Sequence, residues 1–237
     1  MRPTDHVSSH RRAGIAPPSA PLARHNRVGA GGAYRTFWGR AALRQFQVGA
    51  VMPSSAQLGA ALAAPVPRCG NPTIVELGSG TGAVSSQIAQ RIADSGRHIE
   101  IEIDPVMAAW LQAARDDIEV IEGNAMDLPN ILASRGLRSA DVVVSSLPWS
   151  LFDAESQAAL LTAVTRSISS SGSFTTFAYI TGLWLPSARR LARLLRDAFD
   201  EVIMTAPVWT NLPPAVVYVC RRPRVSARQG PCPPESQ

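Results

Sequence analysis

Apolar positions between residues 73 and 221 alternate between short strand-like runs and longer runs with helical spacing. The strand-like runs predict strands over 73–77, 98–103, 118–123, 141–146, 173–180, 201–209 and 215–221. The helical runs lie between them and predict helices over 83–94, 105–115, 154–169 and 186–199. This alternation predicts an α/β fold with a doubly wound, seven-stranded, mostly parallel sheet and helices on both faces. A short connection joins the last two strands, so we expect them to pair antiparallel.

The chain before residue 73 predicts an N-terminal helical extension of that domain. Residues 33–48 mix aromatic rings with arginines and predict a short amphipathic helix, which either packs on the core or lies at a lipid interface. A second helix follows, and Ser54 or Ser55 is a plausible N-cap for it. The ordered domain is therefore expected to cover 33–222, with 33–64 as its helical extension.

Positive charge is concentrated at the N-terminus. All 23 basic residues are arginines, and residues 1–45 hold eight of them with one acid, a net charge of +7. The whole chain carries +5, so residues 46–237 come to −2. Residues 1–32, rich in Pro, Ser, Gly and Arg, predict a disordered basic arm, and 223–237 predict a disordered tail. The arm suits an anionic partner, either nucleic acid or an anionic membrane surface, and a solubilising leader is the alternative.

The cysteines and the apolar runs indicate the compartment. Cys69, Cys220 and Cys232 are odd in number and show no metal-like spacing, which favours a reducing environment and predicts no metal site. No apolar run is long enough to span a bilayer, and the N-terminus lacks the apolar core of a signal peptide. We therefore expect a cytoplasmic protein whose membrane contact, if it has one, is peripheral on the inner face.

A glycine-rich segment follows the first predicted strand. Gly78, Gly80 and Gly82 stand at alternate positions, and Glu76 lies two residues before the first of them. Glycines without a Cβ let a ligand approach the backbone closely, at the edge of the sheet where doubly wound folds bind ligands. The spacing G-x-G-x-G differs from the G-x-G-x-x-G of nicotinamide-binding proteins, and Glu76 would repel a pyrophosphate but not a sulfonium or an ammonium group.

Two further segments complete a predicted adenosine pocket. Glu102, near the end of the second strand, is placed to bind both ribose hydroxyls, and we prefer it to Asp104 because apolar residues, including Ile103, alternate with it. Asn124 with the backbone of Ala125, after the third strand, is placed to read the adenine edge. We count Ile103 among the cofactor-binding candidates. An adenosine pocket without a phosphate site predicts S-adenosylmethionine as the ligand.

These motifs resemble those of the class I S-adenosylmethionine-dependent methyltransferases. More narrowly, the sequence is similar to the bacterial phospholipid N-methyltransferases, which convert phosphatidylethanolamine to its methylated forms. The matching stretches cover most of residues 43–222, and they are VGAVMPSS (48–55), VELGSGTG (75–82), EIDP (102–105), EGNAMDL (122–128) and NLPPAVVYVCRR (211–222). The resemblance implies a phospholipid substrate met at an anionic membrane surface. One departure is Ser-Gly-Ser at 171–173, where that family usually has Pro-Gly-Gly before the fifth strand.

The same resemblance extends to the ribosomal RNA adenine dimethylases. Those enzymes carry Asn-Leu-Pro followed by Tyr or Phe after the fourth strand, whereas here Ser146 and Trp149 bracket the Leu-Pro pair. The hydroxyl of Ser146 is a poor substitute for the side-chain amide of that asparagine, so RNA is the less favoured partner. A soluble methyltransferase acting on a small metabolite or on RNA adenine remains the alternative, and a non-catalytic binding protein is the alternative outside enzymes.

The acceptor side offers fewer clear candidates. Ser146, Trp149 and Tyr179 lie near predicted strand ends and are our candidates for catalysis, with Asn211 bordering the mouth of the site. Trp149 and Tyr179 would hold a methylated ammonium by cation–π contact, or else pack in the core. The arginines of the helix over 186–199 would meet anionic lipid, or else lie in water. The sequence does not identify a general base, the head group, the number of methyl groups transferred or the oligomeric state.

Overall fold

A computed structural model describes residues 54–224 with the exceptions of 81 and 94, and these residues form one seven-stranded sheet. The strands are β1 (Thr73–Leu77), β2 (Arg97–Glu102), β3 (Glu119–Glu122), β4 (Ala140–Ser145), β5 (Ile168–Tyr179), β6 (Phe199–Met204) and β7 (Ala215–Pro223). Their spatial order is β3-β2-β1-β4-β5-β7-β6, and β7 is antiparallel to both of its neighbours while the other pairs are parallel. The predicted doubly wound sheet and its antiparallel last pair are confirmed.

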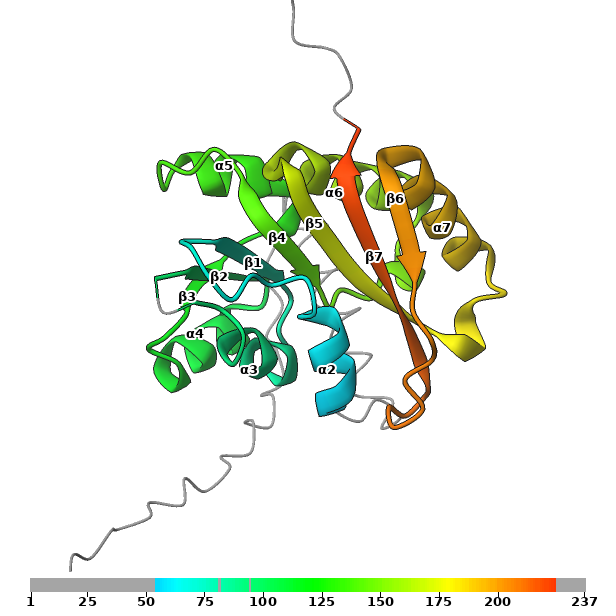
Figure 1. The fold of residues 1–237 in the computed structure, drawn as a ribbon, viewed down its shortest axis with the longest axis horizontal. Coiled ribbons are helices and arrows are strands. Elements are labelled where there is room, and N and C mark those ends of the chain that lie inside the picture. Colours follow the sequence, from blue (N-terminus) through cyan, green and yellow to red (C-terminus); the bar gives the residue numbers. More distant parts are fainter. Residues whose placement is uncertain (1–53, 81, 94, 225–237) are drawn as a thin grey trace, which may run out of the picture.

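Helices cover both faces of this sheet (Figure 1). They are α2 (Ala56–Leu62), α3 (Ala83–Ala89), α4 (Pro105–Ala114), α5 (Leu128–Ala133), α6 (Ala154–Ser167) and α7 (Pro186–Ala198). One face packs against α2, α3 and α4, and the opposite face packs against α5, α6 and α7. Three short 3₁₀ turns of the described chain, η1 (Ala125–Asp127), η2 (Trp149–Leu151) and η3 (Ile180–Gly182), follow β3, β4 and β5.

The predicted extension is described in part. Ser55 is the N-cap of α2, since its Oγ accepts from the Leu58 amide at 3.1 Å. Leu58 and Leu62 are fully buried, and the Leu62 carbonyl accepts a hydrogen bond from Thr175 Oγ1 of β5 at 2.9 Å. The basic arm, the helix predicted over 33–48 and most of the C-terminal tail lie outside the described residues.

Several element boundaries differ from the predictions. α3 ends at Ala89 rather than 94, because residues 90–93 turn back toward β2. α5 was not predicted, since its six residues include Pro129 and show too little periodicity. β6 covers Phe199–Met204 rather than 201–209, because the regular pairing is interrupted around Pro207, which has no amide hydrogen to donate, and Val208 then forms an isolated bridge with Ala215.

The start of β5 is the largest difference. The strand begins at Ile168 rather than 173, and α6 ends at Ser167. The register with β4 shifts between the pairs Ala140–Ile168 and Val142–Ser173, so the intervening residues of β5 form a bulge. A Cβ on Gly172 would lie 2.9 Å from the Asp141 carbonyl oxygen and 2.4 Å from Ile168 Cγ2. Glycine is required there by close packing rather than by turn flexibility.

Candidate cofactor and acceptor site

The glycine-rich loop between β1 and α3 has the backbone conformation that its sequence demands. Gly78, Gly80 and Gly82 have φ values of +70°, +54° and +76°, a region that other residues rarely adopt. A Cβ on Gly78 would also lie 2.8 Å from Leu147 Cδ2, whereas the nearest atom to one on Gly82 is Ser85 Oγ at 4.0 Å. Glycine is therefore required at position 78 by both the backbone conformation and the close approach of Leu147, and at position 82 by the backbone conformation.

Neighbouring strands hold this loop in place on two sides. The Gly78 amide donates to the Ile101 carbonyl of β2 at 3.0 Å, and the Ser146 amide donates to the Leu77 carbonyl of β1 at 3.0 Å. Ser79 is buried, and its hydroxyl donates to the carboxyl group of Glu100 in β2. The loop is thus fixed beside the ends of β2 and β4, where the carboxyl ends of parallel strands form the usual ligand site.

Glu76 and Glu102, the two predicted acids, are both buried on this side of the sheet. Glu76 Oε2 lies 3.1 Å from His98 Nε2, while Glu76 Oε1 has no hydrogen-bond partner among the described residues. Glu102 Oε1 accepts from the Asp104 amide at 3.0 Å, and burial raises the pKa of Glu102 above its usual value. A buried carboxylate oxygen without a donor is costly, which is consistent with a ligand meeting it here.

Asp104 has a different task from Glu102. Its Oδ1 accepts from the amides of Val106 and Met107 at 2.9 and 3.0 Å, so it caps α4, whose first residue is Pro105. The preference for Glu102 over Asp104 as the ribose-binding acid is consistent with this division of roles.

The end of β3 lies beside the end of β2. The Gly123 amide donates to the Glu102 carbonyl at 2.8 Å, which brings the following residues next to the acids. Asn124 Oδ1 accepts from the Met126 amide at 2.9 Å and so caps η1, in which Ala125 is buried. Ile103 packs against the core with part of its surface exposed. All of the predicted cofactor residues therefore lie at the carboxyl ends of β1, β2 and β3.

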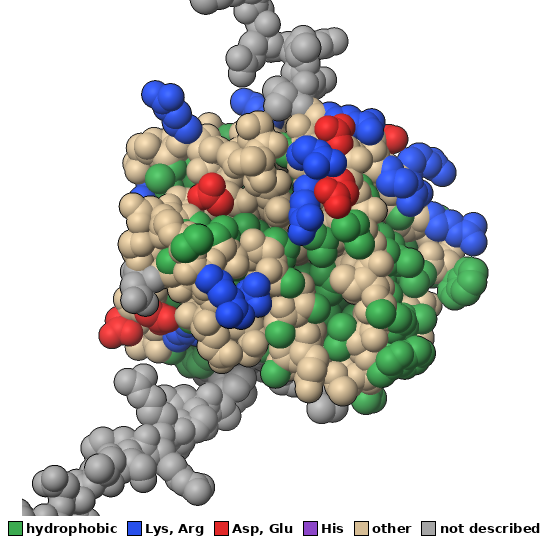
Figure 2. All heavy atoms as spheres, in the orientation of Figure 1, with side chains coloured by type: hydrophobic (Ala, Val, Ile, Leu, Met, Phe, Trp, Pro, Cys, Tyr) green, Lys and Arg blue, Asp and Glu red, His purple; other side chains and the backbone are tan. Residues whose placement is uncertain are grey.

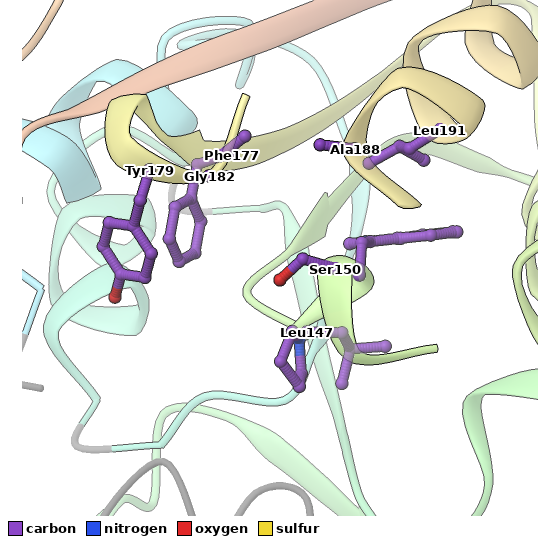
Figure 3. Close-up of a pocket in the computed structure, with 10 residues that line it drawn as sticks. Leu147, Ser150, Phe177, Tyr179, Gly182, Ala188 and Leu191 are labelled. Atoms are coloured by element: carbon purple, nitrogen blue, oxygen red, sulfur yellow. The ribbon is translucent and has the colours of Figure 1, made fainter. Parts of the chain in front are cut away.

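A mostly apolar cavity of about 50 Å³ lies beyond the ends of β4 and β5 (Figure 3). Its wall is formed by η2 and the residues before it, the end of β5 and the start of α7: Leu147, Pro148, Trp149, Ser150, Phe177, Ala178, Tyr179, Gly182, Ala188 and Leu191. In Figure 3 the Phe177 and Tyr179 rings lie on one side, and Leu147 and Ser150 lie on the other. Because a Cβ on Gly78 would lie 2.8 Å from Leu147 Cδ2, the Leu147 side chain borders both this cavity and the glycine-rich loop.

The candidates for catalysis and for the mouth of the site differ in whether they line this cavity: Trp149 and Tyr179 do, whereas Ser146 and Asn211 are not among its lining residues. Tyr179 is partly exposed, and its ring packs edge-on against Phe177 with 5.3 Å between centroids. The Ser146 hydroxyl is buried and has no hydrogen-bond partner in the described chain. Asn211 is buried and structural, since its Oδ1 accepts from the Ser55 amide and its Nδ2 donates to the Pro213 carbonyl.

Trp149 is a core residue that forms the inner wall of the cavity. It is 2% exposed, its Nε1 donates to Ser145 Oγ at 3.0 Å, and its ring packs edge-on against Phe152 and Phe174. Of the two interpretations of this residue, core packing is the one that the geometry favours, because a flat acceptor would need the indole to leave the core.

Sequence reasoning missed three members of the site. Ser79, His98 and Glu100 are buried around Glu76, and Glu100 is the direct strand partner of Glu76. The alternation in the segment HIEIEI placed His98, Glu100 and Glu102 on one face of a strand, which was a usable signal. The pairing of Glu100 with Glu76 depended on the strand order and was not accessible from the sequence.

The fold and the glycine-rich loop define a class I S-adenosylmethionine-dependent methyltransferase. A family model described as a methyltransferase domain matches residues 74–172. An ornithine lipid N-methyltransferase from Singulisphaera acidiphila is 37% identical over 178 residues, which are 73% of this chain and 88% of that protein. The chain belongs to the S-adenosylmethionine-dependent methyltransferases, and it is an enzyme of that family with S-adenosylmethionine as its cofactor.

Solved structures agree on the fold. Spermidine synthase from Thermotoga maritima has a TM-score of 0.55 at 17% identity, with 71% of this chain and 60% of that chain covered. Aeropyrum pernix fibrillarin, solved with natively bound S-adenosylmethionine, has a TM-score of 0.51 at 20% identity, with 69% and 74% covered. Since these proteins differ in name and role, the shared fold does not define the acceptor.

No group of three His, Cys, Asp or Glu side chains among the described residues is placed to hold a metal ion. Within the same residues, none of the helices is long and apolar enough to cross a membrane.

Proposed function

We propose that this enzyme transfers methyl groups from S-adenosylmethionine to the amine of phosphatidylethanolamine-type phospholipids at a membrane surface. The observation that carries the proposal is the mostly apolar cavity whose wall includes Leu147, the residue that also lies against Gly78 of the glycine-rich loop. The lipid N-methyltransferase relative, whose alignment covers 73% of this chain, supports the same acceptor class.

The cofactor residues have complementary roles in this proposal. The backbone at Gly78 and Gly80 lets the cofactor approach closely, and Gly82 lets α3 begin beside the strand. Glu102 binds the ribose hydroxyls, and Asn124, Ala125 and Ile103 contact the adenine side. When bound, S-adenosylmethionine supplies a methyl group already activated by its sulfonium, so the protein mainly aligns the acceptor and excludes water.

The acceptor amine must present a lone pair to react. By analogy with lysine, its ordinary pKa is about 10, so most of it is protonated at neutral pH. Transfer into an apolar cavity disfavours the charged form and so favours the reactive one. The Ser146 hydroxyl, which is buried without a hydrogen-bond partner in the described chain, precedes Leu147 of the cavity wall, and we assign it to orient the amine. We assign the Tyr179 ring, which lines the cavity, to hold the methylated ammonium product.

An apolar surface next to the cavity supports contact with a bilayer. We define the docking patch as Trp184, Leu185, Trp209 and Leu212, which are 75%, 49%, 70% and 64% exposed. The two connections that carry these residues are joined near their bases, because the Ile180 amide donates to the Pro214 carbonyl at 2.9 Å. Large exposed apolar side chains of this kind mark interaction surfaces, and tryptophan favours the membrane interface.

The docking patch also adjoins positive charge and the cavity mouth. Figure 2 shows hydrophobic side chains gathered at the lower right, with arginines above them. Gly182 lines the cavity two residues before Trp184, and Arg189 and Arg193 are exposed on α7, which follows. A bilayer on this patch would present lipid head groups at the cavity while acyl chains stay in the membrane.

The RNA alternative has less support in this geometry. Stacking on an adenine would require an open ring at Trp149, and that ring is buried. No observation of the described residues favours a small soluble acceptor over a lipid head group.

The test is incorporation of labelled methyl groups into defined lipids. Vesicles of phosphatidylethanolamine, of an ornithine lipid or of phosphatidylcholine are incubated with enzyme and labelled S-adenosylmethionine, and the lipids are separated by thin-layer chromatography. We expect label in phosphatidylethanolamine products and none in phosphatidylcholine. Label confined to the ornithine lipid would show that its head group, rather than that of phosphatidylethanolamine, is the acceptor. Label confined to an RNA or metabolite fraction would reject a lipid acceptor.

A further inference from the structure

Four titratable side chains lie together on the face of the sheet beneath the glycine-rich loop. Glu76 of β1 is paired in register with Glu100 of β2, and His98 and Glu102 flank Glu100 on the same face. Each of the four residues is less than one-tenth exposed, and Glu76 and Glu100 are completely buried. Glu76 and Glu102 are predicted cofactor residues, whereas the role of Glu100 described so far is to accept the hydrogen bond of Ser79.

Several polar atoms of these four side chains have no hydrogen-bond partner among the described atoms. His98 Nε2 lies 3.1 Å from Glu76 Oε2, and the Ser79 hydroxyl donates to Glu100 Oε1. Among the described atoms, Glu76 Oε1, Glu100 Oε2 and His98 Nδ1 have no hydrogen-bond partner. The Ser85 hydroxyl of α3, which covers this face, is also buried without one.

Positive charge near this group is limited. Arg115, which follows α4, acts electrostatically on Glu76 and Glu100, but its Nε and Nη2 donate to the Asp117 carboxylate at 2.8 and 2.9 Å. Three buried carboxylates beside one imidazole, that of His98, and one partly neutralised guanidinium are unfavourable if all three are ionised. Burial, with the adjacent Glu76 charge, raises the pKa of Glu100 to about 8.

We propose that Glu100 holds a proton while the enzyme is free of cofactor and releases it to solvent when the sulfonium form of the cofactor binds. Glu100 is thereby a specificity-determining residue, because its ionised form favours cationic S-adenosylmethionine over the product, whose sulfur is uncharged. The Ser79–Glu100 hydrogen bond links this proton directly to the glycine-rich loop. The inference concerns the cofactor and stands independently of the lipid acceptor.

The experiment is calorimetric titration of the whole enzyme with S-adenosylmethionine and with S-adenosylhomocysteine. Heats measured at pH 7 in two buffers of different ionisation enthalpy give the number of protons released. Both ligands carry the same amino-acid group, so the difference between them removes its contribution. We expect a larger proton release with S-adenosylmethionine, and an affinity for it that rises several-fold from pH 6.5 to 7.5.

Two variants test whether the released proton comes from Glu100. Glu100→Gln should abolish the difference in proton release and flatten the pH dependence, whereas the exposed control Glu155→Gln should leave both unchanged. Ser79→Ala removes a hydrogen bond that lowers the pKa of Glu100, so its proton release should extend to higher pH. Equal proton release for the two ligands in the unmodified enzyme, or an unchanged difference in Glu100→Gln, would overturn the proposal.

If Glu100→Gln does not fold, the unmodified enzyme still decides the matter through the difference between the two ligands. Ser79→Ala then supplies the assignment to this group, because a proton held elsewhere would not respond to it. An unshifted pH profile in Ser79→Ala counts against Glu100.

Discussion

The two halves of the ligand-binding edge use opposite physical devices. At the ends of β1, β2 and β3 the site consists of backbone with positive φ, buried acids and capped turns. At the ends of β4, β5 and β7 it consists of apolar and aromatic side chains, with an exposed patch beside the cavity. The first half can hold the cofactor with hydrogen bonds from fixed groups, and we propose that the second half receives the head group of a lipid whose acyl chains stay in the membrane.

Leu147 is the residue at which the halves meet. It lines the cavity, and it occupies the space that a Cβ on Gly78 would need. Changes to the first half should therefore alter cofactor affinity, and changes to the docking patch should alter the use of lipid in vesicles. Each prediction below tests whether these effects separate.

The largest expected effect is that of Gly78→Val. It places a β-branched residue at a φ of +70°, and its Cβ would lie 2.8 Å from Leu147 Cδ2, so the backbone is strained and either Leu147 or the loop must shift. We expect affinity for S-adenosylmethionine to fall about 100-fold or more, equivalent to about 3 kcal/mol, by calorimetry.

Gly70 supplies a matched control for that change. It has a φ of +78°, yet no heavy atom of the described residues lies within 4 Å of its Cβ position. Gly70→Val should lower thermal stability through backbone strain while leaving cofactor affinity intact. Equal losses of affinity in both variants would show that strain alone, not the loop, is responsible.

The next effect is that of Glu102→Gln. Removing the charge that we assign to the ribose hydroxyls should weaken S-adenosylmethionine binding about 10- to 100-fold, since hydrogen bonds to a charged group contribute about 1.5–3 kcal/mol. Asp104→Ala is the control, because loss of the α4 N-cap should cost about 1 kcal/mol of stability without a comparable loss of affinity. A larger loss of affinity in Asp104→Ala than in Glu102→Gln would indicate that Asp104, not Glu102, binds the ribose.

A smaller effect is expected for the double change Trp184→Ser and Trp209→Ser. Both side chains are exposed, so the fold should be retained, while methyl transfer to lipid in vesicles falls about tenfold through weaker binding to the membrane. Transfer to the same lipid dispersed in detergent should change little. The control is Val106→Ser, an exposed apolar residue on α4, and a similar loss in that variant would remove the special role of the patch.

The smallest effect concerns stability and pH. The pKa of Glu100 is raised above its unfolded value by burial, so its contribution to stability is fully present below about pH 4.5 and is lost as pH rises toward 8. Glu100→Gln should therefore be more stable than the unmodified enzyme at pH 8, by a few degrees in thermal melting. The advantage should shrink at pH 5, and equal melting curves at both values would contradict the assignment.

The cofactor half was predictable because its signals are local in sequence. The glycine spacing, Glu76 and the strand-end acid Glu102 lie within 30 residues, and each retains its meaning without knowledge of tertiary contacts. The alternation of strands and helices was equally readable. Ser79, His98 and Glu100 were missed because their contacts arise from the register between β1 and β2.

The acceptor half was harder to predict because separate segments build it. Leu147, Phe177 and Leu191 meet at one cavity only after β4, β5 and α7 have packed. The sequence does not distinguish a tryptophan whose ring faces a ligand from one whose ring packs in the core. For Trp149, the hydrogen bond from its indole nitrogen to Ser145 favours the core position. The docking patch likewise depends on the proximity of two loops that are about 25 residues apart.

The most direct test of the whole account is a competition for one labelled methyl pool. Enzyme and labelled S-adenosylmethionine are given phosphatidylethanolamine vesicles, ribosomal RNA and a water-soluble amine in the same tube, and each fraction is counted. We expect label to enter the lipid amine, and we expect this transfer to fall in the Trp184, Trp209 double variant. Label in the RNA or the soluble amine, with the lipid fraction at background, would contradict it.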